Sequence, residues 1–209
     1  MRIIQGAFKG RRITTPRGLS TRPTPEMVRE ALFNMLGEGV VDARVLDLFA
    51  GSGGIGFEAL SRGAQTAVFV EKNPAAVAVL RKNAAAFGCK DRAWILSADA
   101  YRRIPQLEGS RFHIIFAAPP YDNLNLAAIL LGVARARLLA DNGVFVIQIP
   151  SEMDALSAVK GLVLFDQRRY GRNQLCFYHL EASPEGEESP PQPPPAKGGQ
   201  EESPPCQGG

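Results

Sequence analysis

The sequence predicts an α/β fold with a doubly wound, mostly parallel sheet of seven strands. Short, nearly continuous apolar runs alternate with helical patterns between residues 44 and 149, as in parallel sheets that helices cover on both faces. A glycine-rich turn follows the first of these runs. The last two strand-like segments flank Gly171 as a hairpin, so the final strand should be antiparallel to its neighbours. We therefore expect ligands at the carboxyl ends of the strands.

Each element follows from the spacing of apolar residues and from helix-ending signals. Thr24 is expected to cap the first helix, with Pro25 at its first position and Gly37 at its end. A tight turn is expected at residues 141–143. The next helix should follow the glycine turn and end at Arg62, and two further helices should occupy residues 73–88 and 124–138. The strands are expected at residues 44–49, 66–71, 93–97, 112–117, 144–149, 162–170 and 173–180.

The composition is that of an ordinary folded protein, with 209 residues of which 45% are hydrophobic and 22% charged. No apolar stretch reaches the roughly 18 residues of a membrane span, and the N-terminus lacks the apolar core of a signal peptide. We expect a cytoplasmic protein with no membrane partner. Cys89, Cys176 and Cys206 lie far apart without a histidine cluster, so no disulfide and no metal site is predicted.

Charge divides the chain into a basic arm (residues 1–22), a Rossmann-like domain (23–180) and an acidic, proline-rich tail (181–209). Residues 1–180 hold 23 Lys and Arg against 15 Asp and Glu, whereas the tail holds one against six and should be disordered. The arm has six basic residues and no acidic one, and residues 2–5 and 11–15 predict a hairpin. It should bury little apolar surface, so either the domain holds it or an anionic partner orders it. A merely solvated basic surface would explain the charge equally well.

The glycine turn predicts an adenosine-containing ligand. Gly51 and Gly53 permit a positive φ and a close approach of a ligand, and the next helix presents unpaired N–H groups. Gly51, Gly53 and Gly56 also satisfy the G-x-G-x-x-G pattern of NAD-binding proteins, with Glu71 about 20 residues later. The turn by itself does not choose between NAD and other adenosine ligands, or exclude a turn without a ligand.

Three carboxylates accompany the turn: Asp47 in the first strand, Glu71 at the end of the second and Asp99 just past the third. Glu71 could accept both hydroxyls of a ribose, and Asp99 could reach an adenine amino group. Each residue alone could equally be a helix cap or a solvated strand end. Together with the glycine turn, the three favour a nucleoside site.

The segment Ala118-Pro119-Pro120-Tyr121 follows the fourth strand. Its two prolines restrict the backbone and remove two donors, so carbonyl groups point outward with little freedom. The Tyr121 ring offers a face on which a base can stack. An ordinary proline-rich turn is the alternative, but its place in a nucleoside-binding α/β chain favours a target-base site.

The chain resembles the RsmD family of 16S rRNA guanine-N2 methyltransferases over nearly all of residues 1–180. The motifs are R-I-I-x-G (2–6), R-P-T-P-E-M-V-R-E-A-L-F-N (22–34), L-D-L-F-A-G-S-G (46–53), E-A-L-S-R-G-A (58–64), V-E-K-N (70–73) and P-P-Y (119–121). The resemblance implies an S-adenosylmethionine-dependent methyltransferase sheet. It also implies methyl transfer to the exocyclic amine of a guanine in small-subunit rRNA, either free or in an assembling ribosomal particle. We expect a monomer.

The resemblance also implies three groups of site residues. The S-adenosylmethionine site would comprise Asp47, Ala50, Gly51, Ser52, Gly53, Glu71, Lys72, Asp99 and Ala100. The catalytic segment, which takes the target base, would comprise Ala118, Pro119, Pro120 and Tyr121, and the arm would bind RNA through Arg2, Lys9, Arg11, Arg12 and Arg22.

One position departs from the family, which has Asp or Asn where this chain has Ala118. A methyl group cannot accept a hydrogen bond from the target amine, which leaves the Pro119 carbonyl or Asp122. Losing one charge-assisted hydrogen bond of about 1.5–3 kcal/mol would slow transfer roughly 10- to 150-fold. We therefore expect attenuated activity.

Two alternatives keep the same scaffold: a non-catalytic protein that binds RNA or S-adenosylmethionine, and an adenine-N6 methyltransferase, in which Pro-Pro-Tyr also occurs. NAD-dependent dehydrogenation is disfavoured because no residue supplies a hydride-transfer acid. His113 and His179 lie within strand-like segments.

Overall fold

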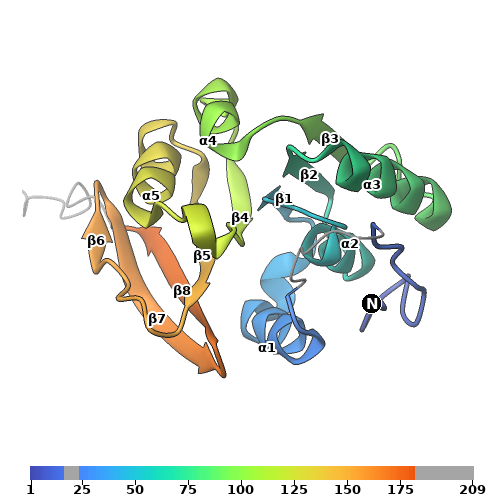
Figure 1. The fold of residues 1–209 in the computed structure, drawn as a ribbon, viewed down its shortest axis with the longest axis horizontal. Helices are drawn as coiled ribbons and strands as arrows, with labels where there is room; N and C mark the ends of the chain where they lie inside the picture. The colour runs from blue at the N-terminus through green and yellow to red at the C-terminus, as the bar shows by residue number, and fades with distance from the viewer. Residues whose placement is uncertain (17–23, 182–209) are drawn as a thin grey trace, which may run out of the picture.

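The computed structural model describes residues 1–16 and 24–181, and it confirms the α/β fold (Figure 1). One sheet has the strand order β3-β2-β1-β4-β5-β8-β7-β6. Strands β1 to β5 are parallel, whereas β8 is antiparallel to both β5 and β7. The strands are β1 (Arg44–Leu48), β2 (Thr66–Glu71), β3 (Ala93–Ser97), β4 (Phe112–Ala117), β5 (Leu139–Pro150), β6 (Ala158–Val159), β7 (Leu162–Tyr170) and β8 (Asn173–Leu180).

The sheet of the described residues therefore has one strand more than the seven expected. The extra strand, β6, pairs with β7 through only two residues, too short a segment to show an alternating pattern. The turn expected at residues 141–143 instead lies within β5. The register between β4 and β5 shifts there: Phe112 pairs with Leu139, whereas Ile114, only two residues later, pairs with Val144.

Helices cover both faces of the sheet, as Figure 1 shows. The core beneath α1 (Glu26–Leu36), α2 (Gly54–Ser61) and α3 (Pro74–Phe87) is separate from the core beneath α4 (Ala100–Arg103) and α5 (Leu126–Arg135). Helix α1 begins one residue later than expected: Pro25 is its N-cap, and no side chain caps it. The Thr24 hydroxyl instead donates to Gln148 Oε1 at 3.1 Å. Short 3₁₀ helices occupy Gly37–Val40 (η1), Ile104–Leu107 (η2) and Tyr121–Asn123 (η3).

The N-terminal hairpin is part of the domain core. Arg2 and Arg12 form its antiparallel bridge, and Ile3, Phe8 and Ile13 are at most 7% exposed. The Phe8 ring stacks on Phe87 of α3 with centroids 5.3 Å apart. The expectation that the arm buries little apolar surface is therefore wrong, since burying each such side chain contributes about 1.5–3 kcal/mol.

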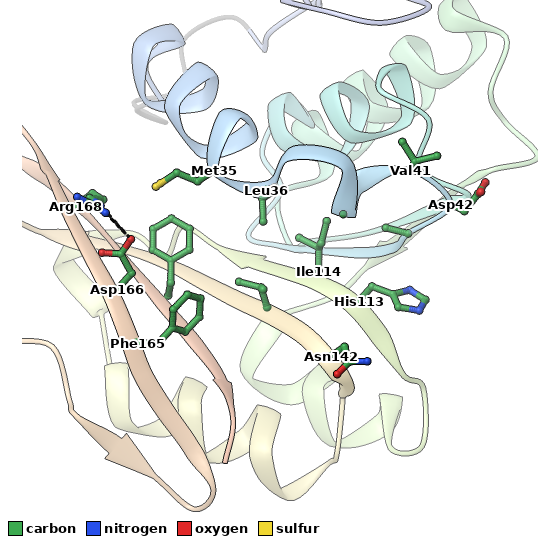
Figure 2. A pocket seen from close by; sticks show the side chains of 14 residues that line it. Met35, Leu36, Val41, Asp42, His113, Ile114, Asn142, Phe165, Asp166 and Arg168 are labelled. Carbon is green, nitrogen blue, oxygen red and sulfur yellow. Dashed lines mark hydrogen bonds and ion pairs between the residues drawn. The ribbon is translucent and has the colours of Figure 1, made fainter. Parts of the chain in front are cut away.

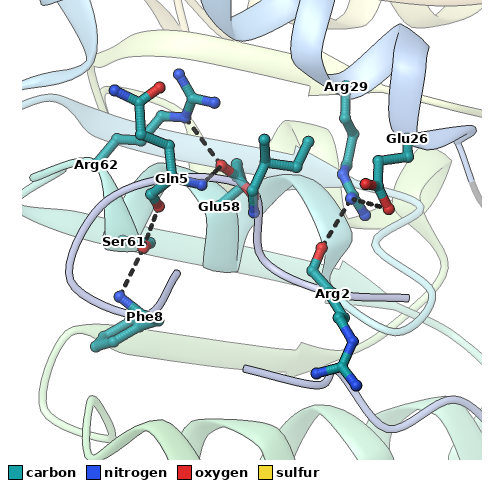
Figure 3. A network of polar contacts seen from close by, with 9 residues as sticks. Arg2, Gln5, Phe8, Glu26, Arg29, Glu58, Ser61 and Arg62 are labelled. Carbon is teal, nitrogen blue, oxygen red and sulfur yellow. Dashed lines mark hydrogen bonds and ion pairs between the residues drawn. The ribbon is translucent and has the colours of Figure 1, made fainter. Parts of the chain in front are cut away.

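A buried carboxylate of α2 fixes the hairpin backbone (Figure 3). Glu58 is 0% exposed, and its two oxygens accept from the N–H groups of Ile4 and Gln5 at 2.8 and 3.0 Å. Arg62 also donates to Glu58, at 2.9 Å. Ser61, one turn along the helix, accepts from the Phe8 N–H through its hydroxyl oxygen. A charge buried with this many partners holds the hairpin in one place on α2.

Two predictions lie wholly or largely outside the described residues: the role of Arg22 and the disorder of the tail beyond Glu181. Within the ranges 1–16 and 24–181, no helix has the length and apolar character needed to cross a membrane.

Candidate active site

The glycine turn connects β1 to α2 and lies between the ends of β2 and β4. Phe49, Gly51 and Gly53 have φ of 62°, 57° and 84°. All three conformations are left-handed and favour glycine, which is present at two of the three positions. A Cβ at Gly51 would meet no atom within 4 Å, whereas one at Gly53 would lie 2.5 Å from the Phe57 ring. Gly51 therefore leaves the space beside the turn open to a ligand, while packing dictates Gly53.

Asp47 lies beneath this turn. It is 2% exposed, and its Oδ2 accepts from the Gly56 N–H at 3.0 Å. Burial raises its pKa to about 7, the negative charge of Glu71 adds to the rise, and the bond from Gly56 opposes it. The structure thus gives Asp47 a position that shapes the start of α2, and direct contact with a cofactor stays a prediction.

Glu71 joins the end of β2 to the turn. Its carboxylate accepts from the Gly51 N–H at 2.8 Å and from the Asn73 N–H at 2.7 Å. A carboxylate offers about four lone-pair sites, so two remain for a ligand such as a ribose. Glu71 is only half-buried, which leaves it open toward solvent.

The other predicted cofactor residues line the same edge of the sheet. Asp99, after β3, caps α4 by accepting from the Tyr101 N–H at 3.0 Å, and its other oxygen lies 3.7 Å from Lys72 Nζ. The Asp99 side chain is 34% exposed, so it serves as a cap and remains reachable. Ala100 and Ala50 are buried and Ser52 is half-buried.

Asn83 of α3 belongs to this neighbourhood, although the sequence analysis missed it. It is 1% exposed; its Nδ2 donates to the carbonyls of Ser52 and Thr14, and its Oδ1 accepts from the Thr14 N–H. The side chain therefore ties the N-terminal hairpin to the glycine turn. Only its position in an otherwise alanine-rich helix could have drawn attention to it.

The Ala118–Tyr121 segment follows β4, the other neighbour of β1. Its backbone stays attached to the sheet through a bond from the Ala118 N–H to the Leu48 carbonyl at 3.4 Å. Pro119 is buried, whereas Ala118 and Tyr121 are half-buried. The Tyr121 hydroxyl donates to Asn173 Oδ1 at 2.5 Å. Asn173 and its neighbour Gln148 are further residues that the sequence analysis missed.

The cations of the arm differ in their surroundings. Arg2 donates to the Gly10 carbonyl at 2.7 Å, and Arg11 lies over the Phe87 ring at 5.0 Å while donating to the Ala86 carbonyl. Lys9 and Arg12 are exposed. The structure thus holds all four residues on a surface that is fixed relative to the glycine turn.

A cavity in the described part of the chain lies elsewhere. It has a volume of about 550 Å³ and is lined by residues including Met35, Asp42, His113, Asn142 and Phe165 (Figure 2). Asp42 precedes β1, and His113 is near the start of β4, so the cavity opens at the amino-terminal edge of the parallel strands. It is therefore separate from the site at their carboxyl ends.

Comparison with known proteins identifies the family. Residues 1–179 match the model of the family described as conserved hypothetical protein 95. The chain is 35% identical to YlbH of Bacillus subtilis over 180 residues, covering 85% of this chain and 98% of that protein. It is 38% identical to ribosomal RNA small subunit methyltransferase D of Escherichia coli over 143 residues, covering 68% of each chain. The chain belongs to the RsmD family.

Solved structures show that this RsmD-family chain has the fold of S-adenosylmethionine-dependent methyltransferases. The Escherichia coli protein yhhF, whose name places it among the methyltransferases, superposes on this chain with a TM-score of 0.79 at 33% identity. That match covers 88% of this chain and 99% of yhhF. RsmC of T. thermophilus, a 16S rRNA N2 methyltransferase solved with AdoMet and guanosine, has a TM-score of 0.62 at 27% identity. That match covers 79% of this chain and 45% of RsmC.

The raised pKa of Asp47 predicts a pH-dependent stability. Between the ordinary value of 3.8 and about 7, the folded chain retains a proton that the unfolded chain releases. The contribution of Asp47 to the free energy of unfolding is therefore fully present below pH 4 and lost as pH rises toward 7, by up to about 1.4 kcal/mol per pH unit. Asp47→Asn removes the titration and keeps an oxygen for the Gly56 N–H, so it should gain stability relative to the parent as pH rises.

Urea denaturation of both proteins at pH 4.5, 6 and 8 measures this difference. Asp141→Asn is the control, because the Asp141 side chain is 91% exposed. A stability difference between Asp47→Asn and the parent that stays constant with pH would show that Asp47 is ionised throughout.

Proposed function

We propose that this protein transfers a methyl group from S-adenosylmethionine to the exocyclic N2 of a guanine in small-subunit rRNA. The observation that carries the proposal is the meeting of three elements at one edge of the sheet. The glycine turn follows β1, Glu71 ends β2, and the Ala118–Tyr121 segment follows β4, with β1 paired between the other two strands. This brings a nucleoside site beside a segment suited to a flipped base.

The relatives support the same chemistry. The Escherichia coli relative is named as a methyltransferase of small-subunit rRNA, and the T. thermophilus structure with the same fold contains both AdoMet and guanosine. We further propose that the chain acts as a cytoplasmic monomer on this rRNA, either free or in an assembling particle.

The residues at the turn fit S-adenosylmethionine. Gly51 leaves open space, the helix α2 presents its N-terminus, and Glu71 has lone pairs free for ribose hydroxyls. Asp99 is available to an amino group of the adenine. When bound, S-adenosylmethionine supplies an electrophilic methyl group, so the chain itself needs no strong acid or base.

The contribution of the protein to the target base is orientation. The lone pair of an exocyclic amine is delocalised into the ring, and acceptors near its N–H groups favour the pyramidal form that can attack a methyl group. Tyr121 would stack on the base, and the Pro119 carbonyl would accept from the amine. Holding the reacting groups in line contributes most of the rate in such a site.

We predict that S-adenosylhomocysteine binds at least tenfold more weakly to Glu71→Ala than to the parent, because a charged acceptor of ribose hydroxyls is lost. Calorimetry with the ordinary ligand and with its 2′,3′-dideoxy analogue separates this contact from distortion of the turn. The analogue lacks the hydroxyls, so its affinity should fall by a smaller factor, and that factor measures the distortion of the turn alone. An equal loss for both ligands would assign Glu71 a purely structural role.

The arm should attract RNA electrostatically. Deleting it would remove Ile3, Phe8 and Ile13 from the core, so charge is better tested by substitution. Lys9→Gln combined with Arg12→Gln should lower the slope of log affinity against log salt by up to about two units, one per phosphate contact. Arg137→Gln with Lys160→Gln is the matched control, because these exposed cations lie in the loops before β5 and β7, outside the arm. An identical effect of the two pairs would argue against a specific role of the arm.

The decisive test of the function is Ala118→Asp. The substitution places an acceptor beside the base that Tyr121 would stack, and the prolines already fix the direction of the loop. Single-turnover methylation of guanine-containing rRNA should rise by about 10- to 150-fold, which corresponds to one charge-assisted hydrogen bond to the amine. The affinity for S-adenosylmethionine should stay constant, because the gain arises in the transition state.

Asp122→Ala and an adenine-only RNA complete the experiment. If Asp122 already serves the amine, Asp122→Ala abolishes the activity of the parent and Ala118→Asp adds little. Methylation of adenine in place of guanine would favour the N6 alternative. Absence of transfer by both the parent and Ala118→Asp would indicate a non-catalytic binding protein. This is the second candidate function, because the methyl group of Ala118 cannot accept a hydrogen bond from the target amine.

A further inference from the structure

A chain of buried amides lies behind the segment proposed to hold the target base. The Tyr121 hydroxyl donates to Asn173 Oδ1 at 2.5 Å, and Gln148 Nε2 donates to the same oxygen at 3.2 Å. Gln148 Oε1 in turn accepts from the Thr24 hydroxyl at 3.1 Å. Asn173 and Gln148 are 5% and 6% exposed. Four residues from β8, β5, η3 and the start of α1 are thus linked by three hydrogen bonds.

These amides share a face of the sheet with Ala118. Side chains alternate along a strand, and Leu175 and Phe177 of β8 contribute to the core beneath α1, as does Val146 of β5. Asn173 is two residues from Leu175, and Gln148 is two residues from Val146, so both amides lie on the same face as these apolar residues. Ala118 packs against this core as well. The polar chain therefore extends into an otherwise apolar core and ends at the base site.

Burying two amides in an apolar core is costly unless their polar atoms are paired. Asn173 Oδ1 uses both lone pairs, one for Tyr121 and one for Gln148, so the acceptor is saturated only when the tyrosine hydroxyl is in place. This favours a single position of the Tyr121 ring. Pro119 and Pro120 restrict the backbone at one end of the residue, and Asn173 holds the hydroxyl at the other.

We propose that Asn173 is a positioning residue that fixes the Tyr121 ring for stacking of the target base. The inference rests on the proposed function, which assigns the base to Tyr121. It goes beyond that function by naming a residue on a distant strand that acts through Tyr121. Positioning matters more in this chain than it would with an acidic residue at 118, because Ala118 offers the amine no acceptor.

The test compares Asn173→Leu, Asn173→Asp, Tyr121→Phe and the double variant in single-turnover methylation of rRNA at saturating S-adenosylmethionine. Asn173→Leu removes the acceptor and should slow transfer about 3- to 10-fold, the worth of one net hydrogen bond. Asn173→Asp keeps an acceptor for both donors and should stay within about twofold of the parent. The affinity for S-adenosylmethionine should be unchanged in all four proteins.

A double-mutant cycle separates positioning from general destabilisation. In the Tyr121→Phe background no hydroxyl remains to be held, so Asn173→Leu should have little further effect on the rate. Gln174→Leu is the matched control: Gln174 is a fully buried amide next in sequence, bonded to Met153 and Gln167, and it lies on the other face of the sheet. It should lower the thermal midpoint without slowing transfer.

Two results would overturn the inference, in different ways. If Asn173→Leu slows transfer by the same factor with and without the Tyr121 hydroxyl, Asn173 acts through the fold and not through Tyr121, while the proposed function stands. If neither the parent nor Ala118→Asp methylates rRNA, the proposed function fails and this inference fails with it.

Discussion

The carboxylate of Glu71 is the contact on which the candidate site depends. By accepting from the Gly51 and Asn73 N–H groups, it joins the end of one strand, the turn after its neighbour and the start of α3. The turn needs such a partner because Phe49 has a φ of 62°, and a left-handed conformation at a residue other than glycine persists only where the surroundings enforce it. The same group that fixes the turn is the one that we propose accepts the ribose hydroxyls.

The arm adds a second constraint, because it is a structural part of the domain. Glu58 holds its backbone from α2, and Asn83 connects its end to the glycine turn. Cations on a mobile tail would give RNA affinity without direction. Cations on a hairpin that shares a core with the domain instead hold the proposed phosphate-binding groups at a set distance from the glycine turn.

At the proposed base site, Ala118 separates two contributions to the rate. The segment keeps the prolines and the tyrosine that we propose orient a base, and it lacks a side chain that could accept from the amine. A buried amide chain from β5 and β8 supports the tyrosine. Electrostatic help and alignment are separate contributions to a rate, and in this chain alignment is the one that the visible contacts provide.

The sequence by itself determined the parallel strands, the glycine turn, the carboxylates in and after the strands and the proline-rich segment, because continuous apolar runs, period-3.6 patterns and local turn chemistry are encoded in neighbouring residues. Only the tertiary structure decided that Phe8 and Ile13 belong to the core, that Thr24 bonds Gln148 in place of capping α1, and that Asn173 meets Tyr121 from 52 residues away. These are contacts between residues distant in sequence, and no local pattern specifies which buried polar groups will find one another when the sheet closes.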